Sequence, residues 1–148
     1  MTSKRTRAEV PYSADQMYAL VAEIERYPEF LPWCVALRIV ERKGEDATEF
    51  ATADMIVAYG VFREKFRSRV KFDPVARRID ADYVEGPFRS LKNEWAFEDL
   101  PTGGSRVDFF IDFQFASRVL QAAAQSAFER IFLKMSDAFI ERAKAVYG

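Results

Sequence analysis

The C-terminal end of the chain constrains the fold more than any other part of the sequence. Residues 117 to 147 contain neither proline nor glycine, the two residues that most weaken a helix interior. As a single α-helix this segment would be about 46 Å long, at ~1.5 Å per residue. Its apolar residues recur at helical spacing, and its polar residues lie mostly on the opposite side. Such a helix is suited to cover the apolar face of a sheet.

The middle of the chain predicts that sheet. Six segments alternate between apolar and polar residues, and residues suited to turns separate them. Gly60 is either a turn or a bulge that curls one long strand, because it alone separates two of the segments. The expected strands are residues 34 to 42, 47 to 59, 61 to 73, 77 to 85, 89 to 98 and 105 to 115.

The N-terminal part of the chain predicts one more strand and two short helices. Residues 4 to 10 have the pattern of an edge strand. Ser13 and Gln16 have the spacing of a capping box, so a helix is expected from residue 14 to about residue 25. A second, very short helix is expected over residues 27 to 31.

This order of elements, a strand, two helices, six strands and a long helix, is typical of the helix-grip fold of the α+β class. In that fold, which START and Bet v 1-like proteins share, a curved antiparallel sheet of about seven strands wraps the last helix. A gap between the sheet and the helix forms a ligand cavity. At 148 residues, the whole chain is expected to form one such domain.

The composition excludes several classes of chemistry. The chain has no histidine, which removes Ser-His-Asp and Cys-His nucleophile systems and every histidine metal site. The formal charge of -1 gives no general attraction to DNA. The single cysteine, Cys34, cannot form an intramolecular disulfide and has no histidine to activate it. Carboxylate, tyrosine or lysine chemistry stays open, as does the absence of any chemistry.

Residues 27 to 34, Tyr-Pro-Glu-Phe-Leu-Pro-Trp-Cys, form the most unusual short segment of the chain. Three aromatic residues and a leucine stand beside two prolines, directly after a helical pattern. Each proline disfavours the α conformation in the residue before it, here Tyr27 and Leu31. We expect one short helical turn and then an extended exit through Trp33. This segment is predicted to close one end of an apolar cavity.

Three stretches of the chain resemble one protein family. They are residues 27 to 34, the turn Glu85-Gly-Pro-Phe88 followed by Leu91 and Trp95, and the long helix after residue 115. Over roughly residues 4 to 146 the chain is similar to the coenzyme Q-binding proteins of the START-like polyketide cyclase/dehydrase superfamily. The resemblance implies non-enzymatic binding and delivery of ubiquinone or a related prenyl lipid, in support of respiratory electron transport. The same family includes bacterial ribosome association toxins.

The resemblance also implies partners and a location. A prenyl quinone is the expected ligand, with no catalytic residue, metal or further cofactor, and its delivery implies transient contact with a membrane surface. No apolar run reaches the ~20 residues that span a bilayer, so this contact is expected to be peripheral. The start of the sequence leaves no room for a mitochondrial presequence, which favours a bacterial protein of the cytoplasm or the inner face of the plasma membrane.

The cavity is expected to take aromatic and apolar residues from the proline-containing segment, the sheet and the long helix, with two polar exceptions. Glu64 and Asn93 interrupt inward-facing apolar rows. Each is either a polar anchor for a quinone carbonyl or cavity water, a general acid or base, or a structural residue paired with Lys134 or Arg142. The rings are either ligand contacts or plain core. The expected cavity and entrance residues are Tyr27, Phe30, Leu31, Trp33, Tyr59, Phe62, Glu64, Phe66, Phe88, Leu91, Asn93, Trp95, Phe128, Ile131 and Met135.

The outward face of the strand over residues 61 to 73 carries a basic row. Such a row binds phosphate, either of RNA in the large ribosomal subunit or of anionic lipid. The alternative is a solvated face whose charges meet Asp80, Asp82 and Glu98 on neighbouring strands. The row consists of Arg63, Lys65, Arg67, Arg69 and Lys71.

Three functions stay open at this point. The first is a carrier of ubiquinone or a similar lipid, and the second is a toxin that binds the large ribosomal subunit and blocks subunit association. The third is a small cyclase or dehydratase in which Glu64 or a tyrosine acts as acid or base. The absence of histidine and of a recognisable catalytic pair disfavours the third function.

Overall fold

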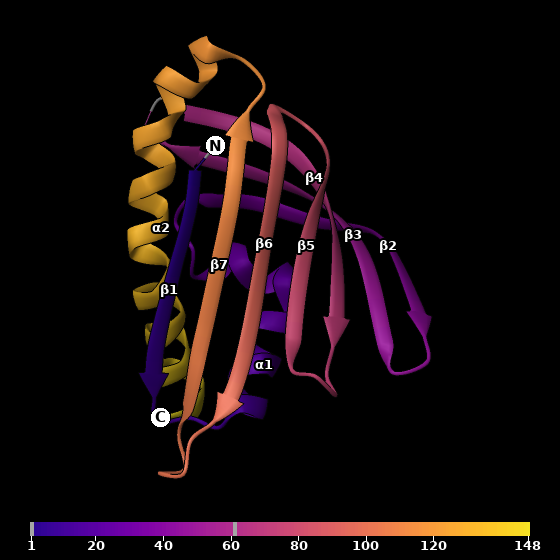
Figure 1. Ribbon diagram of the computed structural model, residues 1–148, viewed down its shortest axis with the longest axis vertical. Helices are drawn as coiled ribbons and strands as arrows, with labels where there is room; N and C mark the ends of the chain where they lie inside the picture. The colour runs from indigo at the N-terminus through magenta and orange to yellow at the C-terminus, as the bar shows by residue number, and fades with distance from the viewer. Residues whose placement is uncertain (1, 61) are drawn as a thin grey trace.

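The computed structural model describes residues 2–60 and 62–148 and has the predicted helix-grip fold (Figure 1). Seven antiparallel strands form one curved sheet in the order β1-β7-β6-β5-β4-β3-β2. Figure 1 shows the long helix α2 (Arg118–Tyr147) running along one side of this sheet, next to β1. The strands are β1 (Thr2–Val10), β2 (Cys34–Glu45), β3 (Thr48–Tyr59), β4 (Phe62–Asp73), β5 (Arg78–Glu85), β6 (Phe88–Asp99) and β7 (Ser105–Phe115).

The strand predictions are confirmed closely. β1 is an edge strand that pairs with β7, as expected from its weak alternation. The expected strand over residues 61 to 73 is β4, and Val61 itself lies outside the described residues. Gly60 has a φ of 62° and follows the end of β3, which pairs with β4 from Tyr59 opposite Phe62 onward. Gly60 therefore belongs to a hairpin, and the alternative of a bulge within one long strand is wrong.

The first helix, α1 (Ala14–Ala22), begins as predicted and ends earlier. The Ser13 hydroxyl accepts a hydrogen bond from the Gln16 backbone N–H at 3.1 Å, and the Gln16 side chain accepts one from the Ser13 N–H at 2.9 Å. This capping box satisfies two amides that the helix leaves without intrahelical partners. The expected end near residue 25 is wrong, because Glu23 leaves the helical conformation with a ψ of 65°.

The second helix, η1 (Ile24–Glu29), is a 3-10 helix and not the turn expected over residues 27 to 31. Tyr27 is helical although Pro28 follows it, which corrects the expectation of an extended conformation there. Residues three apart eclipse each other in a 3-10 helix. Ile24 and Tyr27 therefore point in the same direction, and both are buried. The tighter helix gives the interior two large side chains from one short element.

The hydrophobic core lies between the sheet and the two α-helices. Every second residue of β7 is buried, from Ser105 to Phe115, which is the alternation of a strand with one face on the core. α1 contributes an apolar face in which Met17 and Val21 are almost fully buried. From α2, the buried residues at helical spacing are Ala124, Phe128, Ile131, Phe139 and Ala143.

Candidate functional site

A cavity of about 130 Å³ lies between the inner face of the sheet and α2. Its wall is apolar apart from a few side chains, among them Tyr27, Cys34, Ser68 and Asn93. Pockets that bury drug-sized ligands usually measure roughly 300–1,000 Å³. The space is therefore of the size of a single ring, and because the pocket is partly open, a larger ligand would extend out of it.

Small side chains on neighbouring strands create this space. Ala53 on β3 lies directly opposite Ser68 on β4, and Ala81 on β5 lies opposite Asn93 on β6. Residues opposite each other in an antiparallel pair share a face, and all four line the cavity. Large neighbours along the same rows, such as Trp95, keep the sheet and helix apart. The cavity thus results from small side chains in the middle of the inner sheet face, with large side chains on either side of them.

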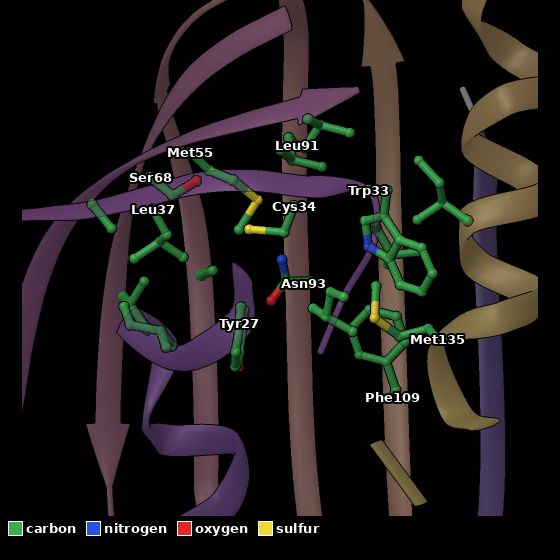
Figure 2. A pocket seen from close by; sticks show the side chains of 18 of the residues that line it. Tyr27, Trp33, Cys34, Leu37, Met55, Ser68, Leu91, Asn93, Phe109 and Met135 are labelled. Carbon is green, nitrogen blue, oxygen red and sulfur yellow. The ribbon is translucent and has the colours of Figure 1, made fainter. Parts of the chain in front are cut away.

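Asn93 places a carboxamide among these apolar walls. Figure 2 shows its side chain near the middle of the pocket, with Tyr27 and Cys34 on nearby elements. Within the described part of the chain, no side-chain hydrogen bond involves Asn93. A carboxamide both donates and accepts hydrogen bonds, and leaving one unused in apolar surroundings costs free energy. Asn93 is half-buried and lines the pocket, so its carboxamide can form hydrogen bonds with water or with a ligand there.

The proline-containing segment contributes Tyr27, Leu31 and Trp33 to the wall. The Tyr27 hydroxyl donates a hydrogen bond to the Val21 carbonyl at 2.5 Å, and burial raises the pKa of Tyr27 well above its usual value. The hydroxyl proton of Tyr27 is thus held in a hydrogen bond inside the protein, and Tyr27 is unsuited to act as a general acid or base. The Trp33 carbonyl accepts a hydrogen bond from the Ala58 N–H at 2.9 Å and ties the end of the segment to β3.

Phe30 lies outside the cavity lining and packs against Tyr27 and the helix α2. Its ring meets Phe139 edge to face, with ring centroids 5.1 Å apart. The Arg142 guanidinium lies 5.0 Å from the centre of the Phe30 ring and also binds Glu29 at 3.0 Å. We call this contact of α2 with Glu29 and Phe30 the Arg142 clamp. It connects the segment to the C-terminal helix across one end of the cavity.

Ten of the fifteen expected site residues line the cavity together, which brings the sheet, the segment and α2 to one place. They are Tyr27, Leu31, Trp33, Phe66, Leu91, Asn93, Trp95, Phe128, Ile131 and Met135. Phe30, Tyr59, Phe62, Glu64 and Phe88 lie outside the lining.

Phe62 and Phe88 belong to an aromatic cluster next to the cavity. Phe88 stacks on Phe115 with ring centroids 4.8 Å apart, and Phe62 meets Phe128 edge to face at 5.9 Å. These rings are buried against one another, so they fill the interior next to the cavity.

Tyr59 lies at the end of β3 and contacts α2 from outside the cavity. Lys134 donates a hydrogen bond to the Tyr59 hydroxyl at 3.2 Å, and this bond lowers the pKa of Tyr59. Glu64 is partly buried opposite Val57. Its expected partners are engaged elsewhere, Lys134 with Tyr59 and Arg142 with Glu29. Glu64 is therefore neither a cavity residue nor part of those expected ion pairs.

The lining also includes residues that were not predicted from the sequence. Period-two alternation along β3, β5 and β7 is the signal that could have identified half of them. The further lining residues are Ile24, Cys34, Leu37, Ala53, Met55, Val57, Ser68, Val70, Ile79, Ala81, Phe109, Ile111, Phe132 and Phe139.

Cys34 lines the cavity as a protonated thiol. Burial raises its pKa to about 11, so the reactive thiolate is scarce at neutral pH. Among the described residues, no group of three or more carboxylate or cysteine side chains could hold a metal ion. In the same part of the chain, no helix is both long and apolar enough to cross a bilayer.

The basic row on β4 is partly neutralised, by partners other than those expected. Arg67 makes two hydrogen bonds to Asp54, at 2.7 and 3.1 Å, and lies 3.9 Å from Glu85. Arg69 lies over the ring of Phe50, 4.7 Å from its centre. Arg63 and Lys71 are exposed on the same face.

Two of the acids that were expected to meet this row do lie opposite it in the strand register, Asp80 opposite Lys71 and Asp82 opposite Arg69. Asp80 also binds Arg78 at 3.1 Å, and Glu98 lies 3.9 Å from Arg106. The outer face of the sheet is thus a mixture of both charges with a few uncompensated cations.

The sequence matches the family described as polyketide cyclase / dehydrase and lipid transport over residues 10–140. The chain belongs to this family. The match begins at the end of β1 and reaches well into α2, so it includes every element that lines the cavity.

Named relatives fall into two groups. The ribosome association toxin RatA of Escherichia coli is 35% identical over 139 residues, which are 94% of this chain and 85% of RatA. The mitochondrial coenzyme Q-binding protein coq10 of Schizosaccharomyces pombe is 30% identical over 137 residues, 91% of this chain and 82% of coq10. Neither name is that of an enzyme.

A solved structure supports the fold within this family. The solution structure of an 18 kDa protein from Caulobacter crescentus has 33% sequence identity and a TM-score of 0.83, and the match covers 100% of this chain and 99% of that protein. The helix-grip architecture expected from the order of elements is therefore confirmed by the structure and by a relative.

Proposed function

We propose that the protein binds and delivers a prenyl quinone such as ubiquinone, without catalysing a reaction. The observation that carries this proposal is an apolar, ring-sized cavity with the Asn93 carboxamide in its middle. A quinone ring is a flat, largely apolar group with two carbonyl acceptors, and the Asn93 N–H can donate to one of them. The name of coq10 and the lipid transport description of the family support this class of ligand.

The prenyl tail needs more space than the cavity offers. The pocket volume of about 130 Å³ holds the ring alone, and the pocket is partly open to its surroundings. The tail must then leave beside the segment from Tyr27 to Cys34, whose Leu31 and Trp33 already face the interior. Movement of this segment away from α2 is thus the conformational change that loading and delivery require.

Both tryptophans of the chain, Trp33 and Trp95, line the cavity, which gives a direct test. Titration with a short-tailed ubiquinone should quench their fluorescence to saturation at one quinone per chain. Asn93→Leu keeps a similar volume without the amide, and it should weaken binding roughly tenfold, the effect of one lost hydrogen bond of about 1.4 kcal/mol. Gln114→Leu, which lies on β7 between the buried Phe113 and Phe115 and outside the cavity lining, is the matched control and should bind as the wild type does.

The two results of this titration are separable. Absence of saturable quenching in the wild-type protein would contradict quinone binding itself. Equal affinity of Asn93→Leu and the wild type would leave a quinone site but remove Asn93 as its anchor.

The RatA relatives favour a second candidate function, binding to the large ribosomal subunit. Arg63 and Lys71 are the cations to test, because Arg67 is already bound by Asp54. Reversing both, as Arg63→Glu with Lys71→Glu, should abolish cosedimentation with large subunits, whereas Lys43→Glu at the tip of β2 should not. Wild-type protein that stays in the supernatant would exclude this function. Neither reversal should change quinone quenching.

A further inference from the structure

The first half of α2 presents an exposed strip to solvent on the side away from the cavity. Val119 and Leu133 within it have 82% and 74% of their surface exposed, unusual values for large apolar side chains. We call this set the α2 strip. Its members are Arg118, Val119, Ala122, Ala123, Ser126, Arg130, Leu133 and Lys134.

The α2 strip combines apolar side chains with positive charge. It contains three cations, Arg118, Arg130 and Lys134, and no carboxylate. The one acid between residues 118 and 134 is Glu129, which lies 3.8 Å from Lys4 on β1 and accepts a hydrogen bond from Gln125. The strip is therefore positive, although the whole chain has a formal charge of -1.

The opposite side of the same helical turns lines the cavity. Phe128, Ile131, Phe132 and Met135 face inward, while Arg130, Leu133 and Lys134 face solvent. A surface bound to the strip would thus be separated from the ligand by a single helix.

We propose that the α2 strip docks the protein on a bilayer that contains anionic lipid. Cationic side chains beside exposed apolar ones match such a surface, because lipid phosphates attract the cations and the acyl region accepts the apolar groups. RNA would use the cations but gives no comparable gain to Val119 and Leu133. The proposal rests on the carrier function above, and it assigns α2 as the element through which the carrier meets the membrane.

Flotation with vesicles of phosphatidylcholine, with and without about one-third phosphatidylglycerol, tests the docking in the absence of quinone. The wild-type protein should float with the anionic vesicles and much less with the neutral ones. Arg118→Gln with Arg130→Gln should weaken binding roughly 25-fold, about fivefold for each cation. Val119→Ser with Leu133→Ser should weaken it at least about tenfold, because two apolar side chains lose their burial.

Matched controls test whether docking depends on the α2 strip or on any exposed cation and apolar side chain. Val75→Ser changes an equally exposed valine, and Lys71→Gln changes a cation on the sheet, so both should float as the wild type does. Absence of flotation, equal binding to neutral vesicles, or binding that the strip variants leave unchanged would overturn the proposal. Binding to large ribosomal subunits that needs Arg118 and Arg130 but not Val119 and Leu133 would also overturn it, in favour of an RNA surface.

The docking and the carrier function can fail independently. Quinone quenching without flotation leaves the carrier and removes the docking surface. Because the strip variants change only exposed side chains, they should quench with quinone as the wild type does, which also shows that they are folded.

Discussion

At the scale of single residues, Asn93 and Cys34 are two polar groups in one apolar wall, and both are uncharged for different reasons. The Asn93 carboxamide carries no charge in any protonation state near neutral pH, so it can stay in the cavity and bind a ligand. The Cys34 thiol is ionisable, and burial holds it in the neutral form by raising its pKa to about 11. Both residues therefore keep the interior free of charge, which suits a ligand that is itself neutral.

The raised pKa predicts slow modification of Cys34. At pH 8 the folded protein should react with a maleimide about a hundredfold more slowly than the denatured chain, because two pKa units separate the thiolate populations. The difference should narrow as the pH approaches 11. Bound quinone should slow the reaction further, since Cys34 lines the same cavity. Equal rates in folded and denatured protein would show that the thiol is not buried.

The same shift makes a prediction about stability. The folded pKa is about 11 and the ordinary value is 9.0, so the contribution of the thiol is complete below pH 9 and is lost as the pH rises through 11. As the pH rises from 9 to 11, the free energy of unfolding measured with urea should decrease less in Cys34→Ala than in the wild type. Parallel curves for the two proteins would contradict the shift.

Residue-scale prediction was mixed where one polar residue interrupted an apolar row, because Asn93 lines the cavity and Glu64 does not. Asn93 was recognisable because a carboxamide interrupts an apolar row. The place of the cavity along the sheet was not, because it depends on Ala53 lying opposite Ser68 and Ala81 lying opposite Asn93. That alignment is a matter of register between strands, and alternation within one strand does not fix it.

At the scale of elements, the turn between β5 and β6 is held in place by a close approach. Gly86 has a φ of 145°, and a Cβ added there would lie 2.7 Å from the Phe66 Cβ. Only glycine combines this conformation with this distance. The Gly-Pro turn that resembled a family motif therefore also fixes how β5 and β6 pass β4.

Gly86→Ala should destabilise the protein by about 1 to 3 kcal/mol, from backbone strain together with the contact on Phe66. Gly44→Ala is the control, because nothing lies within 4 Å of its added Cβ. Urea unfolding of both variants measures the difference. Equal midpoints for the two variants would show that the turn tolerates a side chain.

The Arg142 clamp predicts how fast the cavity exchanges its ligand. Arg142→Gln removes an exposed ion pair with Glu29 and a cation–π contact with Phe30, each of which contributes up to about 1 kcal/mol. Quinone dissociation followed by stopped-flow fluorescence should become roughly tenfold faster. Arg26→Gln is the matched control, because Arg26 binds Glu23 and Glu29 within the same region and has no ion pair with α2 among the described residues. An unchanged rate of quinone dissociation in Arg142→Gln would show that the Arg142 clamp does not control the release of the ligand.

The elements were predicted well in the strands and less well around the prolines. Alternation and turn residues placed all the strands within a few residues of their observed ends. The 3-10 helix was missed because its advantage is tertiary: it turns Ile24 and Tyr27 into the same cavity. Local preferences of residues before proline could not reveal that gain.

At the scale of the whole molecule, the order of elements predicted the fold but not the size of the cavity. The chain pattern predicted a curved sheet around a long helix, which the structure confirms. It could not show that the enclosed volume is only about 130 Å³. A carrier with so little space must open to load its ligand, so the clamp and the proposed docking surface on α2 belong to one account of delivery.

The central claim is that this cavity holds a prenyl quinone, and native mass spectrometry of the purified protein tests it most directly. Wild-type protein incubated with quinone-containing vesicles should carry the mass of one quinone. Ala53→Leu, which fills the cavity, should carry none, and Ala145→Leu, at an exposed position of α2 outside the α2 strip, should carry it as the wild type does. A wild-type protein without bound quinone, or an Ala53→Leu protein that retains it, would contradict the account.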